Sequence, residues 1–267
     1  MVATEETLKS ISASSLNDLM NCERKWAYGH GIDPEVQDQP ATGSLVLGGG
    51  VHQAIEAHLK GESPNVALWK FVAEAKAEGD EHELLLQHGQ SLVEQFQAWH
   101  KQTKFVPTAL EEELRFDIAG FPFAGFIDAR DERTIWDWKT ATAPWDKRKK
   151  ANAWLQGTAY KVGVKQALGI DIERVNFLVL SYGVKKQKVG KFGPYSQNEA
   201  GVYGYEEVEV PVGDAEVRRL ETLVRAYAPR IQSTDINDYP IRPAASGNFL
   251  CDARWCSFFN ICPGGAA

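Results

Sequence analysis

The chain has 267 residues, of which 43% are hydrophobic and 24% are charged, a composition typical of a soluble globular protein and unlike a disordered, collagen-like or disulfide-dense chain. Lys and Arg number 29 against 36 Asp and Glu, so the formal charge of −7 excludes attraction of nucleic acid by the whole surface and requires a local basic patch. There is no apolar run long enough for a membrane span, and the opening residues MVATEETLKS lack the apolar core of a secretion signal. We therefore expect no membrane association and a cytoplasmic location.

The first hundred residues predict helices. Residues 11–30 have apolar side chains at helical spacing, with Ser12 or Ser14 as the N-cap. A loop rich in Gly, Pro and Asp follows to about residue 43, and in residues 43–62 a glycine cluster is expected to open a short helix. Two further helices are expected at 65–78 and 80–102.

The hydrophobic period then changes from helical to alternating. Three successive strands with short turns are expected at 111–118, 121–130 and 133–139. They are followed by a helix at 148–168, a buried strand at 175–183, an edge strand at 202–212 and an amphipathic helix at 214–231 with Asp214 as its cap. This order predicts one α/β domain over 1–267, with a central mixed sheet flanked by helices.

Four cysteines stand at the two ends of the chain, and three of them are spaced C-x4-C-x5-C. In a chain without a secretion signal, clustered cysteines bind metal more often than they form disulfides, and four thiolates can hold zinc or an iron–sulfur cluster. The spacing matches neither common zinc pattern, because both contain C-x2-C pairs. The alternative is one buried helix cysteine and three incidental ones. The residues concerned are Cys22, Cys251, Cys256 and Cys262.

The strand at 133–139 carries the residues best suited to chemistry. Because a strand has a period of two, Asp137 and Lys139 project from one face, while Trp136 and Trp138 project from the other. Asp128 ends the preceding strand, and a hairpin-like neighbour can bring it beside Asp137. Two carboxylates at one point require a cation, and Mg²⁺ or Mn²⁺ prefers such oxygen ligands.

A lysine beside such a metal can position or deprotonate a water, or balance charge on a transferring phosphate. Carboxylates, a divalent metal and a lysine together therefore suit the hydrolysis of a phosphodiester. The alternative is a solvated hairpin, because Asp-x-Lys occurs often by chance. Other residues recur at suitable spacings: Glu56 lies one helical turn after His52, and Gln156 and Tyr160 lie one turn apart on the next helix.

The ordered set of S-x-S-x-L, C-x-x-K-W, G-x3-H, G-x-x-D, D-x-K and Q-x3-Y, followed by a cysteine-rich tail, resembles the RecB-type PD-(D/E)XK nucleases over about residues 12–262. That group includes CRISPR-associated RecB-like exonucleases, the nuclease domains of bacterial helicase–nuclease complexes and phage recombination exonucleases. The resemblance implies a PD-(D/E)XK nuclease core. A phage origin would place the protein in the host cytoplasm.

The resemblance also implies roles for individual residues. An added acid, Glu112 or Glu113, could come from the preceding strand, and the choice between them stays open. Gln156 and Tyr160 would orient the lysine or contact the DNA backbone, and Lys139 would be catalytic. The metal ligands for Mg²⁺ or Mn²⁺ would be His52, Asp128, Asp137 and the backbone carbonyl of Trp138.

Members of the same family often hold a 4Fe-4S cluster with one N-terminal and three C-terminal cysteines. By this resemblance Cys22, Cys251, Cys256 and Cys262 would bind the cluster and join segments 11–30 and 245–264 as a structural staple. Many relatives have C-x2-C where this chain has C-x4-C, so zinc stays open as an alternative.

Two basic runs are candidate DNA contacts, although charge runs are usually only solvated faces. Trp145 and Tyr195 could stack on unpaired bases. The glycine cluster is not a phosphate-binding P-loop, so a processive enzyme would need a partner motor or a ring-shaped oligomer. The runs contain Lys147, Arg148, Lys149 and Lys150, then Lys185 and Lys186 with Lys188 and Lys191.

These features together predict a metal-dependent deoxyribonuclease, and more specifically an exonuclease acting on duplex ends or single strands in recombination, repair or CRISPR adaptation. A partner recombination, helicase or CRISPR adaptation protein is expected. The alternatives are a non-cutting DNA-binding or assembly subunit with the nuclease fold, and a site-specific endonuclease of the same superfamily. The direction of cleavage stays open.

Overall fold

The structure of the chain, a computed structural model, describes residues 9–36, 43–75, 79–183, 189–190, 193–194, 203–241, 251 and 256–264. Its N-terminal helices are α1 (Ala13–Asn21), α2 (Glu23–Gly29), α3 (Gly43–Leu59), α4 (Pro64–Glu74) and α5 (Gly79–Thr103). The middle of the chain holds β1 (Ala109–Ile118), β2 (Phe121–Arg130), β3 (Thr134–Ala141), α6 (Lys147–Asn152), α7 (Trp154–Leu168) and β4 (Arg174–Ser181). It ends with β5 (Val189–Gly190), β6 (Gly193–Pro194), β7 (Tyr205–Val210), α8 (Asp214–Ile231) and the 3-10 helix η1 (Ile236–Asp238).

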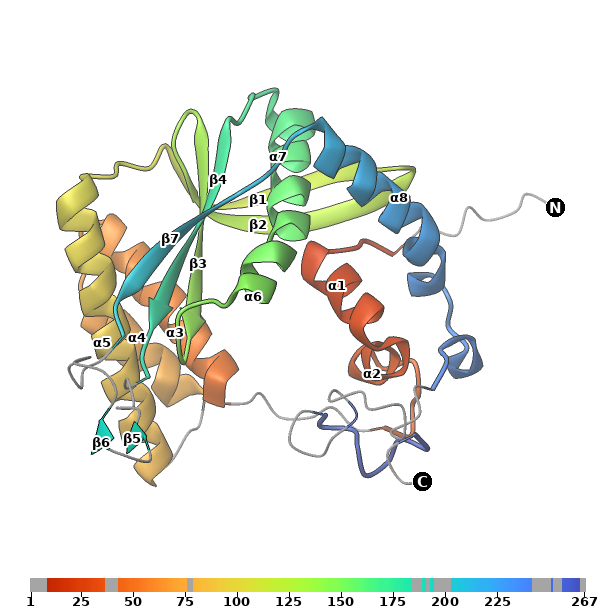
Figure 1. Cartoon of the computed structure of the whole chain (residues 1–267), viewed down its shortest axis with the longest axis horizontal. Helices are drawn as coiled ribbons and strands as arrows, with labels where there is room; N and C mark the ends of the chain where they lie inside the picture. The colour runs from red at the N-terminus through yellow and green to blue at the C-terminus, as the bar shows by residue number, and fades with distance from the viewer. Residues whose placement is uncertain are drawn as a thin grey trace.

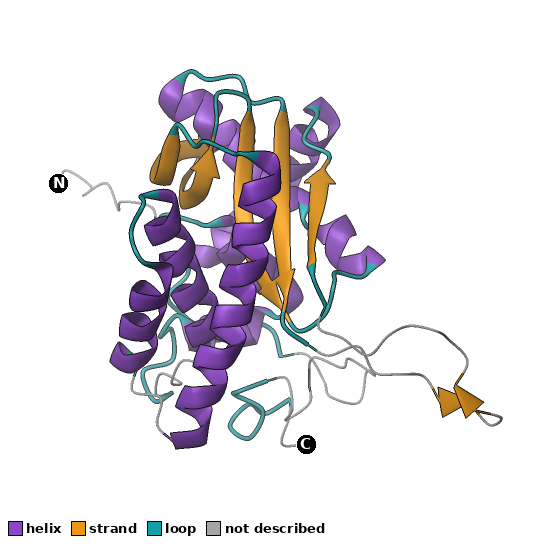
Figure 2. Ribbon diagram, turned by 90° about the vertical axis from the view of Figure 1, so that its left-hand side faces the viewer, coloured by secondary structure: helices purple, strands orange, loops and turns teal. Residues whose placement is uncertain are grey.

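The strands form a mixed five-stranded sheet in the order β1-β2-β3-β4-β7, which confirms the predicted fold class. β3 and β4 are parallel and are joined through α6 and α7, whereas the other neighbouring pairs are antiparallel. β7 is an edge strand, as its alternating sequence predicts. β5 and β6 pair only with each other, apart from the main sheet (Figure 2).

Helices cover both faces of the sheet (Figure 1). One face, which includes Trp136 and Trp138, packs against α3, α4 and α5. The opposite face packs against α7, and a further apolar cluster joins α1, α2, α7 and α8 beside the β1–β2 hairpin. No helix within the described ranges is both long and apolar enough to cross a membrane.

Several predicted boundaries were wrong for local reasons. Residues 11–30 form two helices, because Cys22 adopts an extended backbone (φ −159°, ψ 106°) between them. Ser12 is the cap of the first helix, accepting from the Ser15 amide at 3.0 Å. The helix predicted at 148–168 is likewise divided, at Ala153, and Asp214 is the first residue of α8 after the cap Gly213.

The glycine cluster lies inside α3 rather than at its start. A Cβ atom on Gly49 would lie 2.5 Å from the Phe71 ring of α4, and one on Gly50 would lie 3.1 Å from Leu68. These glycines therefore allow α3 and α4 to pack closely. This packing holds the helix that carries His52 against the sheet.

Candidate active site

The site is built at the point where β2 and β3 separate. The two strands pair only at Ala129–Trp136 and Arg130–Ile135, and beyond those residues the β1–β2 hairpin runs away from β3 (Figure 1). The Asp128 carboxylate occupies the opening, where its Oδ2 accepts the backbone N–H of Trp138 at 2.6 Å. A side chain thus replaces the strand partner that this amide would otherwise have.

β3 presents its two faces as the sequence predicts. Trp136 and Trp138 are buried among the aromatic side chains of α5, with ring centroids 4.9 Å and 5.6 Å from that of Trp99. Asp137 is 1% exposed, and its Oδ2 lies 2.5 Å from the Lys139 ammonium. Burial raises the pKa of Asp137, while the Lys139 charge acts in the opposite direction.

α7 supplies a polar support for Asp137. Tyr160 donates from its hydroxyl to Oδ1 at 3.1 Å, and Gln156 donates from its side-chain amide to the same oxygen at 3.2 Å. The Gln156 amide also donates to the Tyr160 hydroxyl at 2.6 Å. Burial raises the pKa of Tyr160, so the hydroxyl keeps its proton. These two residues contact Asp137, whereas the sequence led us to expect contact with the lysine or DNA.

His52 reaches the site from α3. Its Nε2 lies 2.9 Å from the Trp138 carbonyl oxygen, and its Nδ1 lies 3.3 Å from Oδ1 of Asp128. Burial alone would lower the pKa of His52, but the Asp128 carboxylate outweighs it and raises the pKa to about 9. The structure thus places an imidazole, two carboxylates and an amine beside the Trp138 backbone.

A further acid completes the cluster, and it is neither of the two that the sequence suggested. Glu112 is held by Arg130 at 2.7 Å, and Glu113 is paired with Arg115. Instead, Glu111 joins His52 and Asp128, so that one ligand atom from each of the three lies within 4.8 Å of the others.

The environment of Glu111 is unfavourable for a lone carboxylate. Burial, followed by the charge of Asp128, raises the pKa of Glu111 to about 7. Its backbone also has a φ of 47°, in the left-handed region that a non-glycine residue in a strand rarely adopts. Acids crowded in this way are stabilised by a bound cation.

Strand register could have identified Glu111 from the sequence. Ala119 and Gly120 form a two-residue turn with positive φ values of 56° and 89°, and Ile118 pairs with Phe121 across it. Counting back along the antiparallel pair places Glu111 opposite Asp128. Such tight turns fix the register of a hairpin, so the turn was the missed signal.

A profile of the PD-(D/E)XK nuclease superfamily matches residues 10–263. The chain belongs to this superfamily. No curated protein sequence matches it. Among solved structures it resembles a protein from Eubacterium rectale named "Putative exonuclease", with 14% identity and a TM-score of 0.56 over 86% of this chain and 83% of that one. It also matches a phage related exonuclease from Haemophilus somnus 129PT, with 14% identity and a TM-score of 0.38 over 84% and 95% of the two chains. Only the first match has a TM-score above 0.5, and at 14% identity it supports the fold alone.

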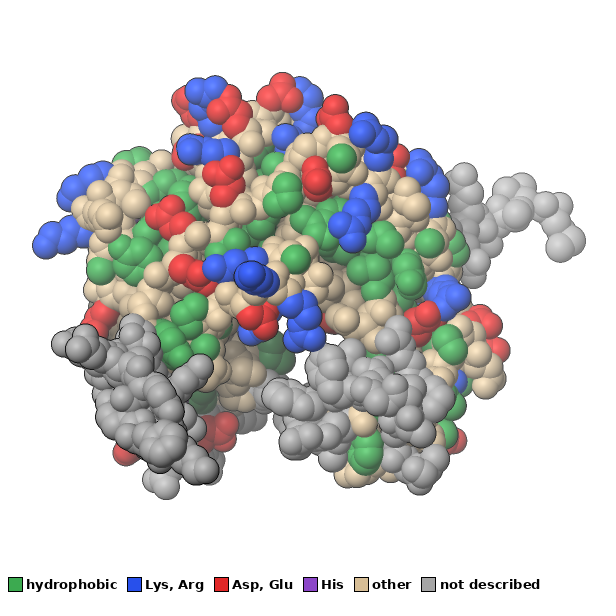
Figure 3. Space-filling model, viewed as in Figure 1, with side chains coloured by type: hydrophobic (Ala, Val, Ile, Leu, Met, Phe, Trp, Pro, Cys, Tyr) green, Lys and Arg blue, Asp and Glu red, His purple; other side chains and the backbone are tan. Residues whose placement is uncertain are grey.

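The basic run after the Asp-x-Lys strand of this PD-(D/E)XK nuclease is divided by the fold. Lys150 is paired with Glu206 of β7 at 2.7 Å, whereas Arg148 and Lys149 line a cleft that also reaches Lys139. Figure 3 shows blue side chains gathered over α6 near the middle of one face. Trp145 lines the same cleft. The second run, with Lys185 and Lys186, and also Tyr195, lies outside the described residues.

The nuclease chain brings its two cysteine-bearing ends together. Phe258 of the C-terminal segment packs on Tyr28 of α2, with ring centroids 5.5 Å apart. Burial raises the pKa of Cys256, and the neighbouring sulfurs of Cys22 and Cys262 raise it further. No disulfide joins the four cysteines.

The spacing of the sulfurs bears on the choice of metal. Tetrahedral zinc with bonds of about 2.3 Å would bring its ligand sulfurs within about 4 Å of one another. Among the described residues, which include all four cysteines, the only group of three or more ligand atoms within 4.8 Å of one another is that of His52, Glu111 and Asp128. No three of the cysteine sulfurs in the described part of the chain meet this spacing.

Proposed function

We propose that the protein is a metal-dependent DNA nuclease of the RecB type that removes nucleotides from DNA ends or single strands. The observation that carries this proposal is the placement of His52, Glu111 and Asp128 around one point, beside the buried pair of Asp137 and Lys139. Membership of the superfamily supports the chemistry, and the exonuclease name of the neighbour from Eubacterium rectale agrees with action at ends.

The donor set fits a hard divalent cation. Burial, followed by the charge of Asp128, raises the pKa of Glu111 to about 7. A cation bound between the two carboxylates would offset their repulsion. Asp128, Asp137 and Glu111 would hold Mg²⁺ or Mn²⁺, together with the Trp138 carbonyl, and the imidazole of His52 favours Mn²⁺. When bound, the cation would lower the pKa of a water and polarise the scissile phosphodiester.

The residues around the cation site have separate tasks. Lys139 carries its ammonium at the rim of the site, where it can align a nucleophilic water or balance charge that develops on the phosphate. Gln156 and Tyr160 hold Oδ1 of Asp137, so that Oδ2 stays directed at Lys139. This fixed geometry lowers the cost of reorganisation during the reaction.

We further propose that residues 1–267 act as one nuclease domain whose ends are stapled by a 4Fe-4S cluster on Cys22, Cys251, Cys256 and Cys262. The nearness of Cys22, Cys256 and Cys262 supports a shared cofactor, and the resemblance to nucleases that hold such a cluster favours iron–sulfur over zinc. Iron and zinc analysis of protein purified without oxygen tests this: stoichiometric zinc without iron refutes the cluster. Processive digestion would draw on a partner recombination, helicase or CRISPR adaptation protein.

Substitution of Lys139 tests the proposed activity. Lys139→Ala and Asp137→Asn should abolish Mn²⁺-dependent digestion of end-labelled DNA while the far-ultraviolet circular dichroism stays that of the wild type. Lys165→Ala is the matched control, because Lys165 pairs with Asp171 at the exposed end of α7. Full activity in either site variant refutes the assignment. Digestion of closed circles would identify an endonuclease, and a wild type without digestion would identify a non-cutting DNA-binding subunit.

A further inference from the structure

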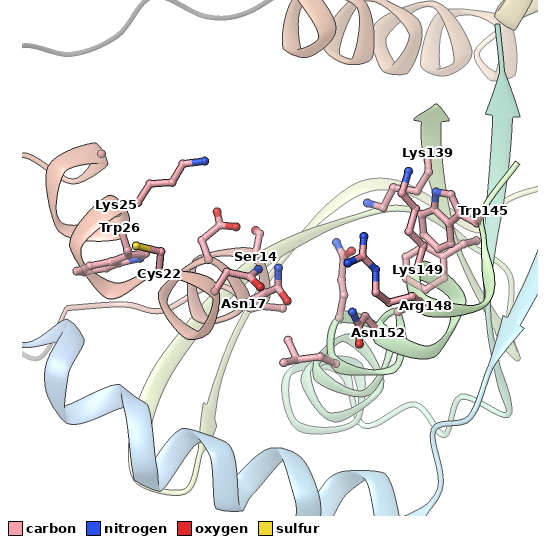
Figure 4. A pocket seen from close by; sticks show the side chains of 18 of the residues that line it. Ser14, Asn17, Cys22, Lys25, Trp26, Lys139, Trp145, Arg148, Lys149 and Asn152 are labelled. Carbon is pink, nitrogen blue, oxygen red and sulfur yellow. The ribbon is translucent and has the colours of Figure 1, made fainter. Parts of the chain in front are cut away.

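A cleft of about 760 Å³ lies between the α1–α2 arm and α6, and Lys139 lines it beside Trp145, on the side opposite Lys25 (Figure 4). Figure 4 shows side chains that extend into it from both sides, Lys25 and Asn17 from one and Arg148 and Lys149 from the other. Gln156, which contacts Asp137, also lines it. The cleft therefore opens directly onto the proposed active site.

The charge of the cleft is opposite to that of the whole chain. Among the residues that the structure describes, four cationic side chains line it, Lys25, Lys139, Arg148 and Lys149, against one acid, Asp18. The chain as a whole carries a formal charge of −7. A concentration of positive charge in a concave site on an acidic protein favours an anionic polymer over the rest of the surface.

The polar and aromatic lining suits unpaired nucleotides. Asn17, Asn21 and Asn152 supply amide groups that can bond phosphates and base edges, and Trp145 supplies a ring on which a base can stack. Glu206 of β7 holds this wall in place, because it accepts from the Trp145 amide at 2.6 Å. It also accepts from the Lys150 ammonium at 2.7 Å.

The lining of the cleft bears on the form of the polymer. Its volume of about 760 Å³ lies within the range of roughly 300–1,000 Å³ that is typical of small-ligand pockets, so it can hold a few nucleotides. A ring such as that of Trp145 stacks on the face of an unpaired base, whereas the paired bases inside a duplex already stack on each other. The lining therefore favours a single strand.

We propose that the cleft binds a single DNA strand and leads its backbone to Lys139, so that unpaired strands are the substrate class. The role of the cleft in catalysis rests on the proposed nuclease function, but the binding of DNA in the cleft can be measured without catalysis. Arg148 and Lys149 from α6, with Lys25 from α2, would contact successive phosphates.

The test measures the fluorescence anisotropy of labelled oligo-dT, and of a hairpin duplex of equal length, in buffer with EDTA. We expect the wild type to bind the single strand more tightly. Lys149→Ala and Lys25→Ala should each weaken binding about tenfold. Each should also reduce the slope of log K against log salt by about 0.7, the value for one lost phosphate contact on a single strand.

Lys165→Ala is the control, because Lys165 pairs with Asp171 at the exposed end of α7 and does not line the cleft. It should leave the slope unchanged. Equal binding of the duplex, or equal slope changes at Lys165 and Lys149, would overturn the cleft proposal even if the wild type digests DNA. Selective strand binding without any digestion would uphold the cleft and overturn the nuclease function.

Discussion

Replacement of Glu111 by glutamine probes the acid cluster most directly. Glutamine keeps the size of the side chain and faces the same left-handed backbone (φ 47°), so the change removes only the carboxylate. Glu113→Gln is the matched control, because Glu113 is exposed on the same strand and paired with Arg115. We expect Glu111→Gln to stabilise the protein without metal and to reduce the stabilisation that Mn²⁺ provides.

Without metal, glutamine should stabilise the protein above neutral pH. Burial and the charge of Asp128 raise the pKa of Glu111 from 4.5 to about 7, so the folded state holds this proton more tightly than the unfolded state. The free energy of unfolding of the wild type therefore falls as pH rises from 4.5 to about 7. The full difference would be about 3 kcal/mol. Screening by water at this half-buried carboxyl reduces it to about 1–2 kcal/mol.

With Mn²⁺ most of this advantage of glutamine should disappear. A ligand at 100 times its dissociation constant stabilises the folded state by about 2.7 kcal/mol. Loss of a residue that only supports a metal ligand typically weakens metal affinity at least about tenfold, so loss of the Glu111 carboxylate should weaken Mn²⁺ affinity by at least about that factor. A tenfold weaker affinity removes about 1.4 kcal/mol of the stabilisation by Mn²⁺. Each kcal/mol moves the melting temperature by about 2–4 °C in a domain of this size class.

Thermal melts at pH 5 and pH 8, in EDTA and in Mn²⁺, measure all of these effects. Glu111→Gln should melt higher than the wild type at pH 8 in EDTA, match it near pH 5, and show a smaller Mn²⁺ shift. Glu113→Gln should follow the wild type throughout. An Mn²⁺ shift as large as that of the wild type would refute the placement of Glu111 at the metal, and a lower melting temperature in EDTA at pH 8 would refute the electrostatic argument.

Three further substitutions test other parts of the structure. Tyr160→Phe removes one of the donors to Asp137, so kcat should fall about 10- to 100-fold with little change in KM, and unchanged kcat would contradict its positioning role. Gly157→Ala would place a Cβ atom 2.7 Å from Val210, so urea unfolding should show a loss of about 1–3 kcal/mol despite the better helix propensity of alanine, and a gain would contradict the close packing of α7 on the sheet. Cys22→Ser should lower bound iron and the melting temperature together, and unchanged iron content would exclude this cysteine as a cluster ligand.

Much of the fold and of the site follows from local patterns. The period of two along 133–139 places Asp137 and Lys139 on one face and the two tryptophans on the other, and β3 has this arrangement. The helix predicted at 214–231 has those same bounds in α8. Period and capping are local properties, since they depend on residues within a few positions of each other.

The details that decide the chemistry depend on contacts between distant segments. Glu111 becomes part of the site because the register of the hairpin places it opposite Asp128. Its neighbours Glu112 and Glu113 instead form ion pairs with arginines. In the sequence, nothing distinguishes Lys150 from the three basic residues before it. In the structure it is paired with Glu206 of β7.

The sequence by itself determined the residue types of the site, the faces of its strands and the mixed sheet, because side-chain periodicity is written into the chain. Only the tertiary structure decided which acid completes the cluster, which cations line the cleft and where the cysteine-bearing ends meet. Those outcomes depend on strand register, helix packing and the pairing of charges far apart in sequence, which the free energy of the whole fold sets and no local pattern encodes.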